Sequence, residues 1–116
     1  MSPFPIVRIR GRALGSKVTV NLLSIRAAGG ARVVVRCRGK GCPRKQASAR
    51  AVSAKRPVRL RSLERVYSPG AVLEVYVTKP GRIGKYVRFR IRNGAAPARI
   101  DGCLSTRRMR TVKCPA

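Results

Sequence analysis

Alternation of apolar and basic residues, with a period of two, is the feature that most constrains the fold of this chain. In residues 32–38, Val33, Val35 and Cys37 alternate with arginines and one further valine. Successive side chains of a β-strand point to opposite faces, so this pattern predicts a strand with one apolar and one charged face. Comparable runs occupy residues 6–10, 17–22, 58–61, 73–78 and 87–92. The sequence therefore predicts an all-β protein.

Turn-forming residues separate these runs at short intervals. Glycine, proline, asparagine and serine break the pattern at residues 11–16, 29–30, 39–43, 68–70, 79–81 and 93–94. Consecutive Leu22 and Leu23 shift the phase of the second run, which indicates a β-bulge. The alanine-rich residues 44–54 also alternate, and we interpret them as a strand. About seven strands at this spacing are typical of an antiparallel two-sheet sandwich.

A length of 116 residues predicts one domain with a single hydrophobic core. The alternating pattern ends near residue 96. We therefore predict a β-sandwich over residues 1–96 and an irregular C-terminal extension over residues 97–116, closed by Cys103 and Cys114. The residues expected to face the core are Val7, Ile9, Val18, Val20, Val33, Val35, Leu60, Leu73, Val75, Val77, Val87, Phe89 and Ile91.

The charge balance excludes several function classes. The chain has 28 Lys and Arg residues, no histidine and only three acidic residues, Glu64, Glu74 and Asp101, for a formal net charge of +25. Without histidine the usual physiological general base is absent, and three scattered acids do not supply paired catalytic carboxylates. A hydrophobic content of 44% excludes a disordered basic tail. We expect a folded protein that is not an enzyme and takes no cofactor or metal.

Two features of the sequence resemble known extracellular domains. Residues 67–77 resemble the corner between strands E and F of fibronectin type III and related immunoglobulin-like domains, although this chain has Leu73 where those domains usually carry a tyrosine. Residues 35–43, residues 79–89 and the tail from Cys103 to Pro115 look like an arginine-rich, cysteine-paired module of secreted actinobacterial proteins. The resemblance implies an extracellular, immunoglobulin-like β-sandwich of no established activity.

The four cysteines permit more than one chemistry. Four residues separate Cys37 from Cys42, and ten separate Cys103 from Cys114. Structural zinc sites favour two to four intervening residues in each pair, so the longer gap counts against zinc. Two local disulfides fit better, while crossed pairings and free thiols stay open because sequence alone does not determine connectivity. A catalytic thiol is disfavoured without a histidine partner.

Arginines form a second pattern. Alternate residues of a strand share a face, so Arg88, Arg90 and Arg92 are expected to form one row. One interpretation is an ordinary solvated surface, since basic residues occur in every strand. The other is a polyanion-binding sheet, because guanidinium groups pair bidentately with phosphate and carboxylate. The candidate polyanion-binding residues are Arg36, Arg38, Arg59, Arg61, Arg88, Arg90 and Arg92.

Two further motifs favour no specific ligand. Residues 79–85 lack the Gly-x4-Gly-Lys-Ser/Thr pattern of a phosphate-binding loop, so we interpret them as a hairpin loop. Tyr76 and Tyr86 fall on outward or edge positions and could stack on nucleic-acid bases. Packing against neighbouring side chains is the simpler account of both rings.

The expected function is that of a non-enzymatic secreted or cell-surface module with a structural, adhesive or polyanion-binding role. Its partners would be a cell-wall polymer, polysaccharide or nucleic acid bound without sequence selectivity, and neighbouring domains of a larger chain. The alternative is a small basic nucleic-acid-binding protein. Disulfides would indicate an extracellular location, and reduced thiols an intracellular one. No apolar run is long enough for a membrane span, and any secretory signal would lie upstream of Met1.

Overall fold

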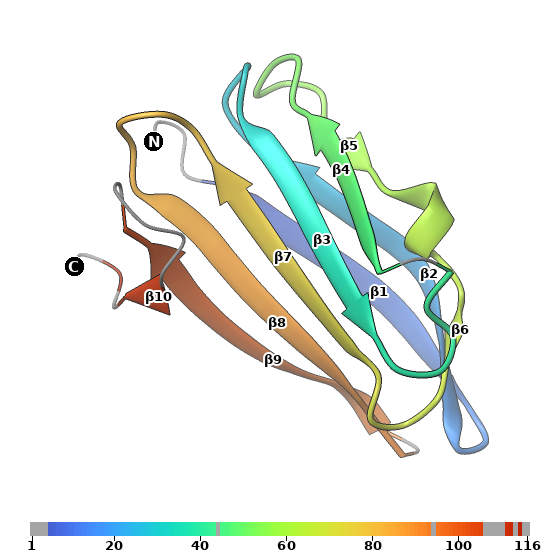
Figure 1. Ribbon diagram of the computed structural model, residues 1–116. Helices are drawn as coiled ribbons and strands as arrows, with labels where there is room; N and C mark the ends of the chain where they lie inside the picture. Colours follow the sequence, from blue (N-terminus) through green and yellow to red (C-terminus); the bar gives the residue numbers. More distant parts are fainter. Residues whose placement is uncertain (1–4, 44, 94, 106–110, 113, 115–116) are drawn as a thin grey trace.

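The computed structural model describes residues 5–43, 45–93, 95–105, 111–112 and 114 as two antiparallel sheets (Figure 1). The four-stranded sheet has the order β1-β2-β5, with β6 also paired to β2. Its strands are β1 (Ile6–Leu14), β2 (Lys17–Arg26), β5 (Val58–Arg59) and β6 (Val66–Tyr67). The predicted all-β class and two-sheet arrangement are confirmed.

The second sheet has six strands in the order β10-β9-β8-β7-β3-β4. These strands are β3 (Arg32–Arg38), β4 (Gln46–Arg50), β7 (Val72–Thr78), β8 (Gly84–Arg92), β9 (Ala95–Leu104) and β10 (Thr111–Val112). A short 3-10 helix, η1 (Arg61–Leu63), lies between β5 and β6. The described residues thus contain ten strands, where the sequence pattern predicts about seven.

Apolar side chains from both sheets meet in one core. Of the thirteen residues predicted to face inward, all except Ile9 are buried, and Ile9 packs partly buried against the others. Leu23, Ile25, Leu63 and Tyr67 complete the core and are fully buried. Alternation predicts this core well because a strand with one apolar face has only one favourable side to bury.

The predicted β-bulge lies in β2. Arg10 pairs with Leu22, but the next residue, Gly11, pairs with Val20, so Asn21 is the additional residue. The insertion lets Val20 and Leu23, three positions apart, both face the core. Because the additional residue lies in β2, the alternation of β1 continues without interruption.

Three expectations about secondary structure are wrong. Residues 11–16, expected to form a turn, belong to β1 as far as Leu14. The irregular extension expected from residue 97 is instead a strand as far as Leu104, and β9 pairs with β8 from Arg92–Ala95 to Gly84–Leu104. The pattern of alternating apolar residues fails there because the inward face of β9 carries charged side chains. In residues 58–61 the strand ends at Arg59, and η1 follows.

The loop between Cys37 and Cys42 packs closely against the start of β7 and the end of β6. The Ser68 amide donates a hydrogen bond of 3.1 Å to the Lys40 carbonyl oxygen. Gly41 has a φ of +106°, and a Cβ atom at this position would lie 2.5 Å from the carbonyl oxygen of Val66. Glycine is therefore required at this point for the loop to lie on β6.

Candidate functional site

The alternation of β8 exposes a row of three arginines. Val87 and Phe89 are fully buried, whereas the intervening Arg88 is partly exposed and Arg90 and Arg92 are exposed. Arg88, Arg90 and Arg92, called here the β8 arginine row, therefore project from the outer surface of the six-stranded sheet. Their shared face is the one that the sequence predicts.

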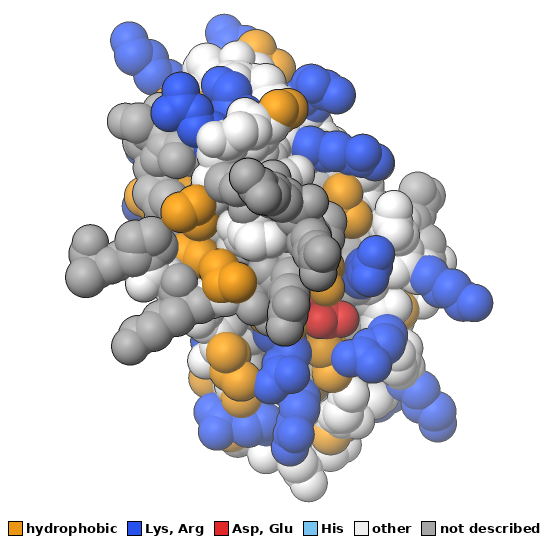
Figure 2. Space-filling view, turned by 60° about the vertical axis from the view of Figure 1, so that its left-hand side comes forward, with side chains coloured by type: hydrophobic (Ala, Val, Ile, Leu, Met, Phe, Trp, Pro, Cys, Tyr) orange, Lys and Arg blue, Asp and Glu red, His pale blue; other side chains and the backbone are white. Residues whose placement is uncertain are grey.

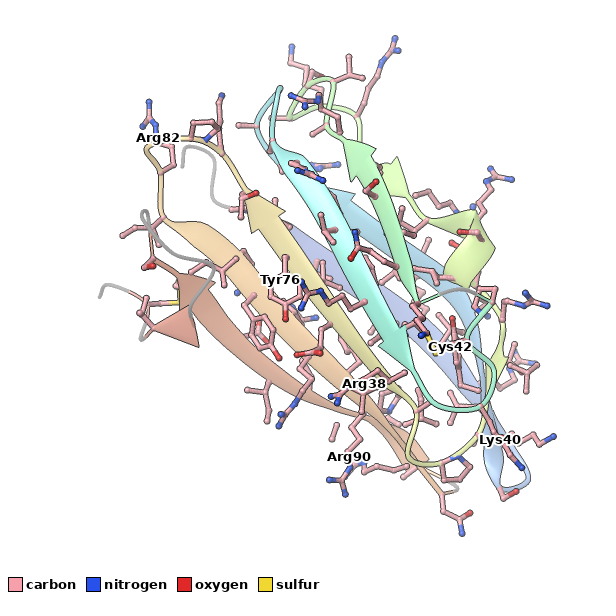
Figure 3. The ribbon with its side chains drawn as sticks, in the orientation of Figure 1. Arg38, Lys40, Cys42, Tyr76, Arg82 and Arg90 are labelled. Carbon is pink, nitrogen blue, oxygen red and sulfur yellow. A yellow bond between two sulfur atoms is a disulfide. The ribbon has the colours of Figure 1, made fainter. Side chains whose placement is uncertain are left out.

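Strand register brings two more of the predicted residues to this surface. Arg36 of β3 and Arg88 of β8 both pair with Glu74 of β7, from opposite sides. One row further along, Arg38 and Arg90 both pair with Val72. Since neighbouring strands lie about 4.8 Å apart, each pair of arginines is separated by roughly 10 Å at the backbone. Arg38 and Arg90 lie on this surface in Figure 3.

We call this surface the basic face and define it as Arg36, Arg38, Arg88, Arg90 and Arg92. The structure brings together five of the seven predicted polyanion-binding residues in this way.

Glu74 is the acidic residue in the middle of the basic face, and its carboxylate is already engaged. The Tyr86 hydroxyl donates a hydrogen bond of 2.7 Å to Oε2, and the Tyr76 hydroxyl donates one of 3.3 Å to the same atom. Arg38 Nη2 lies 3.7 Å from Oε1. Burial, followed by the neighbouring carboxylate, raises the pKa of both phenols, so they stay protonated at neutral pH.

Beside Glu74 lies a broad, open concavity of about 1040 Å³. Arg36, Arg38 and Lys45 provide its positive charge, and Tyr76 forms part of its wall. The guanidinium of Arg36 lies 5.3 Å from the centre of the Tyr76 ring, which holds the arginine by a cation–π contact. Lys45 is a basic residue of this concavity that the sequence does not single out. It lies just before β4, within residues 44–54, which the sequence predicts to be a strand.

The first disulfide forms one end of this concavity. Cys37 and Cys42 are bonded, with their Cα atoms 5.6 Å apart, and both line the concavity. Cys103 and Cys114 form the second disulfide. The local pairing preferred from the sequence is thus present. With all four sulfurs in disulfides, the zinc interpretation has no thiolate ligands.

Arg59 and Arg61 lie away from the basic face, Arg59 in β5 of the other sheet and Arg61 in η1. Arg59 is committed to Glu64, with Nε 2.8 Å from Oε2 and Nη2 3.0 Å from Oε1. The Leu23 amide also donates to Glu64, at 3.1 Å. The hydrogen bond from Arg59 is the main reason why the pKa of Glu64 is lowered. Arg61 lies in η1 and is exposed.

A second arginine row, absent from the prediction, lies on β1. Arg8, Arg10 and Arg12 are all exposed, and they alternate with the inward-facing Val7 and Ile9. This β1 arginine row projects from the outer surface of the four-stranded sheet. The alternation of residues 6–10 indicates the shared face of Arg8 and Arg10, whereas Arg12 lies in residues 11–16, which the sequence predicts to be a turn.

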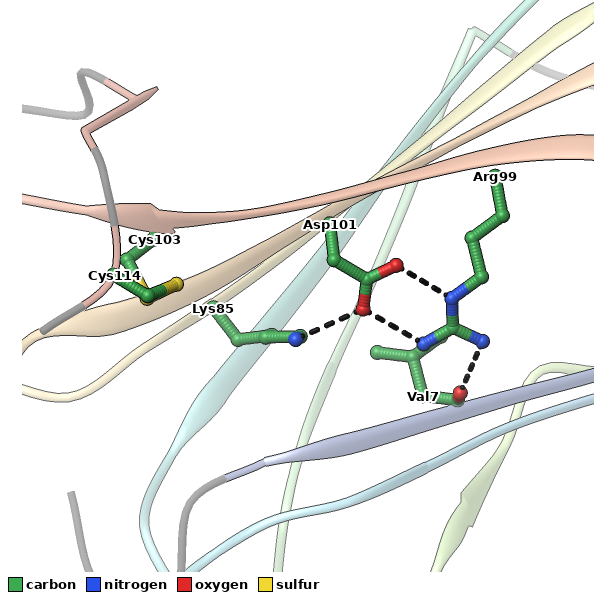
Figure 4. Close-up of polar contacts among 6 residues, drawn as sticks. All are labelled: Val7, Lys85, Arg99, Asp101, Cys103 and Cys114. Carbon is green, nitrogen blue, oxygen red and sulfur yellow. Dashed lines mark hydrogen bonds and ion pairs between the residues drawn. A yellow bond between two sulfur atoms is a disulfide. The ribbon is translucent and has the colours of Figure 1, made fainter. Parts of the chain in front are cut away.

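A second cluster of charged residues joins the two sheets at their edge (Figure 4). Arg99 donates from Nε to Oδ1 of Asp101 at 2.7 Å and from Nη2 to Oδ2 at 3.0 Å. Lys85 Nζ lies 2.9 Å from the same Oδ2. These contacts, led by the hydrogen bond from Arg99, lower the pKa of Asp101 to about 2. The cluster faces the space between the sheets, so its role is structural.

The arrangement of charges on the basic face suits anion binding by guanidinium groups. Among the described residues no group of three or more His, Cys, Asp or Glu side chains is placed to hold a metal ion. In the same part of the chain no helix is long and apolar enough to cross a membrane. Comparisons with protein-family models, curated proteins and solved structures find no match.

Proposed function

We propose that this protein is a non-enzymatic module that binds anionic polymers without sequence selectivity. The observation that carries the proposal is the basic face, where five arginines share one surface with a single carboxylate. Arg36 and Arg88 flank this carboxylate, and two phenols and Arg38 already hold it. The face therefore offers guanidinium groups to an external anion, with little competition from acidic residues of the protein itself.

The spacing of these arginines suits a polymer better than a small ion. Residues two apart in a strand lie about 6.7 Å apart, and the two arginines of each cross-strand row lie roughly 10 Å apart. A single phosphate or sulfate group reaches only part of this area, whereas a charged polymer contacts several guanidinium groups together. Binding would then release condensed counterions from the polymer and weaken as salt rises.

The outer surface of a sheet gives little means of recognising bases. Base-specific contacts use side chains inserted into a groove or aromatic rings stacked on unpaired bases. Tyr76 is the accessible ring at the concavity, and the guanidinium of Arg36 already lies over it. The proposed binding therefore depends on charge density, and a polysaccharide would compete with DNA.

We propose a secreted or cell-surface location for this module. Both disulfides are consistent with an oxidising environment, since such bonds are rare where cellular reductants act. The anionic polymer encountered there would be a cell-wall polymer or an acidic polysaccharide.

An immunoglobulin-like topology is part of the same proposal. Such sandwiches place strands A, B and E in one sheet and strands C, F and G in the other, with a C′ strand added beside C in some members. The orders β1-β2-β5 and β8-β7-β3-β4 match these positions. Tyr67, buried at the end of β6, donates its hydroxyl hydrogen to the Leu63 carbonyl. This bond resembles that of a tyrosine corner and supports the proposal, although Leu73 stands where such domains usually carry the tyrosine. β9 and β10 extend the sheet beyond the G position.

The test compares binding of duplex DNA, single-stranded DNA and heparin at several salt concentrations. For the unaltered protein we expect log affinity to fall linearly with log salt, and heparin to displace DNA of any sequence. Replacing Arg88, Arg90 and Arg92 together by Ser should flatten the slope for duplex DNA by about three units.

A matched control removes equal charge away from the basic face. Lys55, Arg56 and Arg82 are exposed and lie in the loops after β4 and β7, so their joint replacement by Ser should change the slope less. Equal effects of the two triple substitutions would mean that net charge, not the basic face, governs binding. Strong preference for one nucleic-acid sequence would support the alternative, a nucleic-acid-binding protein.

A further inference from the structure

The β1 arginine row has the same construction as the β8 arginine row. In both, three arginines occupy alternate positions of one strand. Phe89 and Ile91 separate those of β8, whereas Ile9 and Gly11 separate those of β1. The register shift opposite Gly11 leaves this pattern intact because the additional residue belongs to β2. Arg8, Arg10 and Arg12 therefore share one face, with about 6.7 Å between successive positions.

The two rows lie on opposite sides of the molecule. β1 belongs to the four-stranded sheet and β8 to the six-stranded sheet, and the buried core fills the space between them. The sheets run behind one another in Figure 1, and Figure 2 shows Lys and Arg side chains at the top, on the right and at the bottom of the visible face, with hydrophobic side chains on its left. Packed sheets lie about 10 Å apart, and outward arginine side chains add to that separation.

Little uncompensated negative charge opposes either row. Glu74 lies beside Arg88, and Arg38, Tyr76 and Tyr86 hold its carboxylate. Glu64 is the acidic residue on the four-stranded sheet, and Arg59 neutralises it with two hydrogen bonds. Asp101 faces the space between the sheets, where Arg99 and Lys85 hold it. Both outer surfaces therefore present a net positive row to solvent.

We propose that the protein is bivalent: the β1 arginine row binds a second anionic polymer chain, so that one protein molecule cross-links two polymers. The inference rests on the proposed function, because the partner of both faces is the same chemical class. It goes further by assigning a second binding surface. Arg10 and Arg12 line a concavity at the sheet edge together with Ala96 and Pro97 of β9, and Arg92 donates a hydrogen bond to the Ala96 carbonyl oxygen. The proposal therefore requires that a polymer extended along the β8 row ends short of this edge, which leaves the β1 row to another chain.

The experiment measures bridging between two DNA duplexes. One duplex is immobilised and the other is fluorescent and free, and the protein is added at a concentration below that of the immobilised duplex. The unaltered protein should capture the fluorescent duplex. Replacing Arg8, Arg10 and Arg12 by Ser, or making the same change in the β8 row, should leave binding to the immobilised duplex measurable. Either change should reduce capture by roughly tenfold to a hundredfold at physiological salt.

The matched control is the triple Ser variant at Lys55, Arg56 and Arg82, which removes the same charge and should retain capture. Circular dichroism of each variant verifies that it is folded. Capture that persists in both row variants would overturn the bivalent arrangement. Binding of one duplex without capture by the unaltered protein would overturn it too, while leaving the proposed function in place. Failure to bind either duplex or heparin would overturn the proposed function itself.

Discussion

Arg99 Nη1 donates a hydrogen bond of 2.9 Å to the main-chain oxygen of Val7 and thereby links β9 of one sheet to β1 of the other. The guanidinium is fixed from two further sides. Asp101 accepts two hydrogen bonds from the guanidinium. The Cζ atom of Arg99 lies 5.3 Å from the centre of the buried Phe89 ring. A carbonyl group on the edge strand of a sheet thus gains a partner from within the molecule.

Replacing Arg99 by Ala should lower the free energy of unfolding by about 1.5 to 3 kcal/mol, the usual range for hydrogen bonds that involve a charged group. The variant loses the hydrogen bond to the Val7 carbonyl oxygen, and Asp101 keeps its ion pair with Lys85. Urea unfolding followed by circular dichroism measures the change. Arg90→Ala, at an exposed position of β8, is the control and should change stability by less than about 0.5 kcal/mol. Equal effects of the two substitutions would contradict a structural role for the cluster.

Stability in acid should depend on Asp101. Its pKa lies at about 2 in the folded protein against an ordinary value of 3.8. A carboxyl group with a lowered pKa contributes stability above its ordinary pKa and loses it as the pH falls toward the folded value. Asp101→Asn should therefore be less stable than the unaltered protein at pH 7, and the difference should shrink between pH 3.8 and about 2. Thermal unfolding across this range provides the measurement, and a constant difference would contradict the assignment.

The same cluster explains why the sequence pattern fails for β9. Alternation predicts strands whose inward face is apolar, as in β3, β7 and β8. On β9 the inward positions include Arg99 and Asp101, which are satisfied by contacts with residues far away in the sequence. Single-sequence periodicity carries no information about such partners. The C-terminal segment is consequently predicted as irregular from residue 97, although it pairs with β8 as far as Leu104.

For the candidate site, alternation predicts which side of a strand an arginine occupies but not which strands become neighbours. The β8 arginine row follows directly from the sequence. Its combination with Arg36 and Arg38 depends on β7 lying between β3 and β8, which is a property of the sheet order. Arg59 lies apart from this face for the same reason, because the sheet order places β5 in the other sheet. The hydrogen bonds of Glu74 depend on cross-strand register, and residue spacing does not predict them.

Substitution of Phe89 tests which face of β8 points toward the core. The side chain is fully buried, so Phe89→Ala should cost about 3 to 5 kcal/mol of unfolding free energy through lost burial and cavity formation. Ile100→Ala, at a half-exposed position of the neighbouring β9, is the control and should cost much less. Chemical denaturation of both variants checks the difference. A loss below about 0.5 kcal/mol at Phe89 would mean that the faces are inverted.

The disulfides should be detectable in the intact protein by mass. Purified without reductant, the chain should be lighter by four hydrogen atoms than the reduced chain, because all four cysteines are paired. Replacing Cys103 and Cys114 by Ser should lower stability by about 2 to 3 kcal/mol, since the bond closes a short loop. In this variant the main-chain amides that pair β9 with β8 should stay protected from hydrogen exchange, because main-chain hydrogen bonds hold the two strands together. Four free thiols in the oxidised sample would contradict both the pairing and the proposed extracellular location.

Glu74 provides the last prediction, because it places one negative charge at the centre of the basic face. Glu74→Gln removes that charge and keeps an oxygen that accepts a hydrogen bond from Tyr86. At about 10 Å in water, removing one unit charge changes the interaction with each bound anionic group by roughly 0.4 kcal/mol. Affinity for heparin and duplex DNA should therefore rise by about twofold or more, and the gain should diminish at high salt. Asp101→Asn removes equal charge from the space between the sheets and should increase affinity less, because no polymer lies against it. Fluorescence titration of the two variants measures both affinities. Equal gains in affinity would mean that polymers respond to net charge alone. A larger gain for Glu74→Gln would locate the bound polymer over β7, between Arg36 and Arg88.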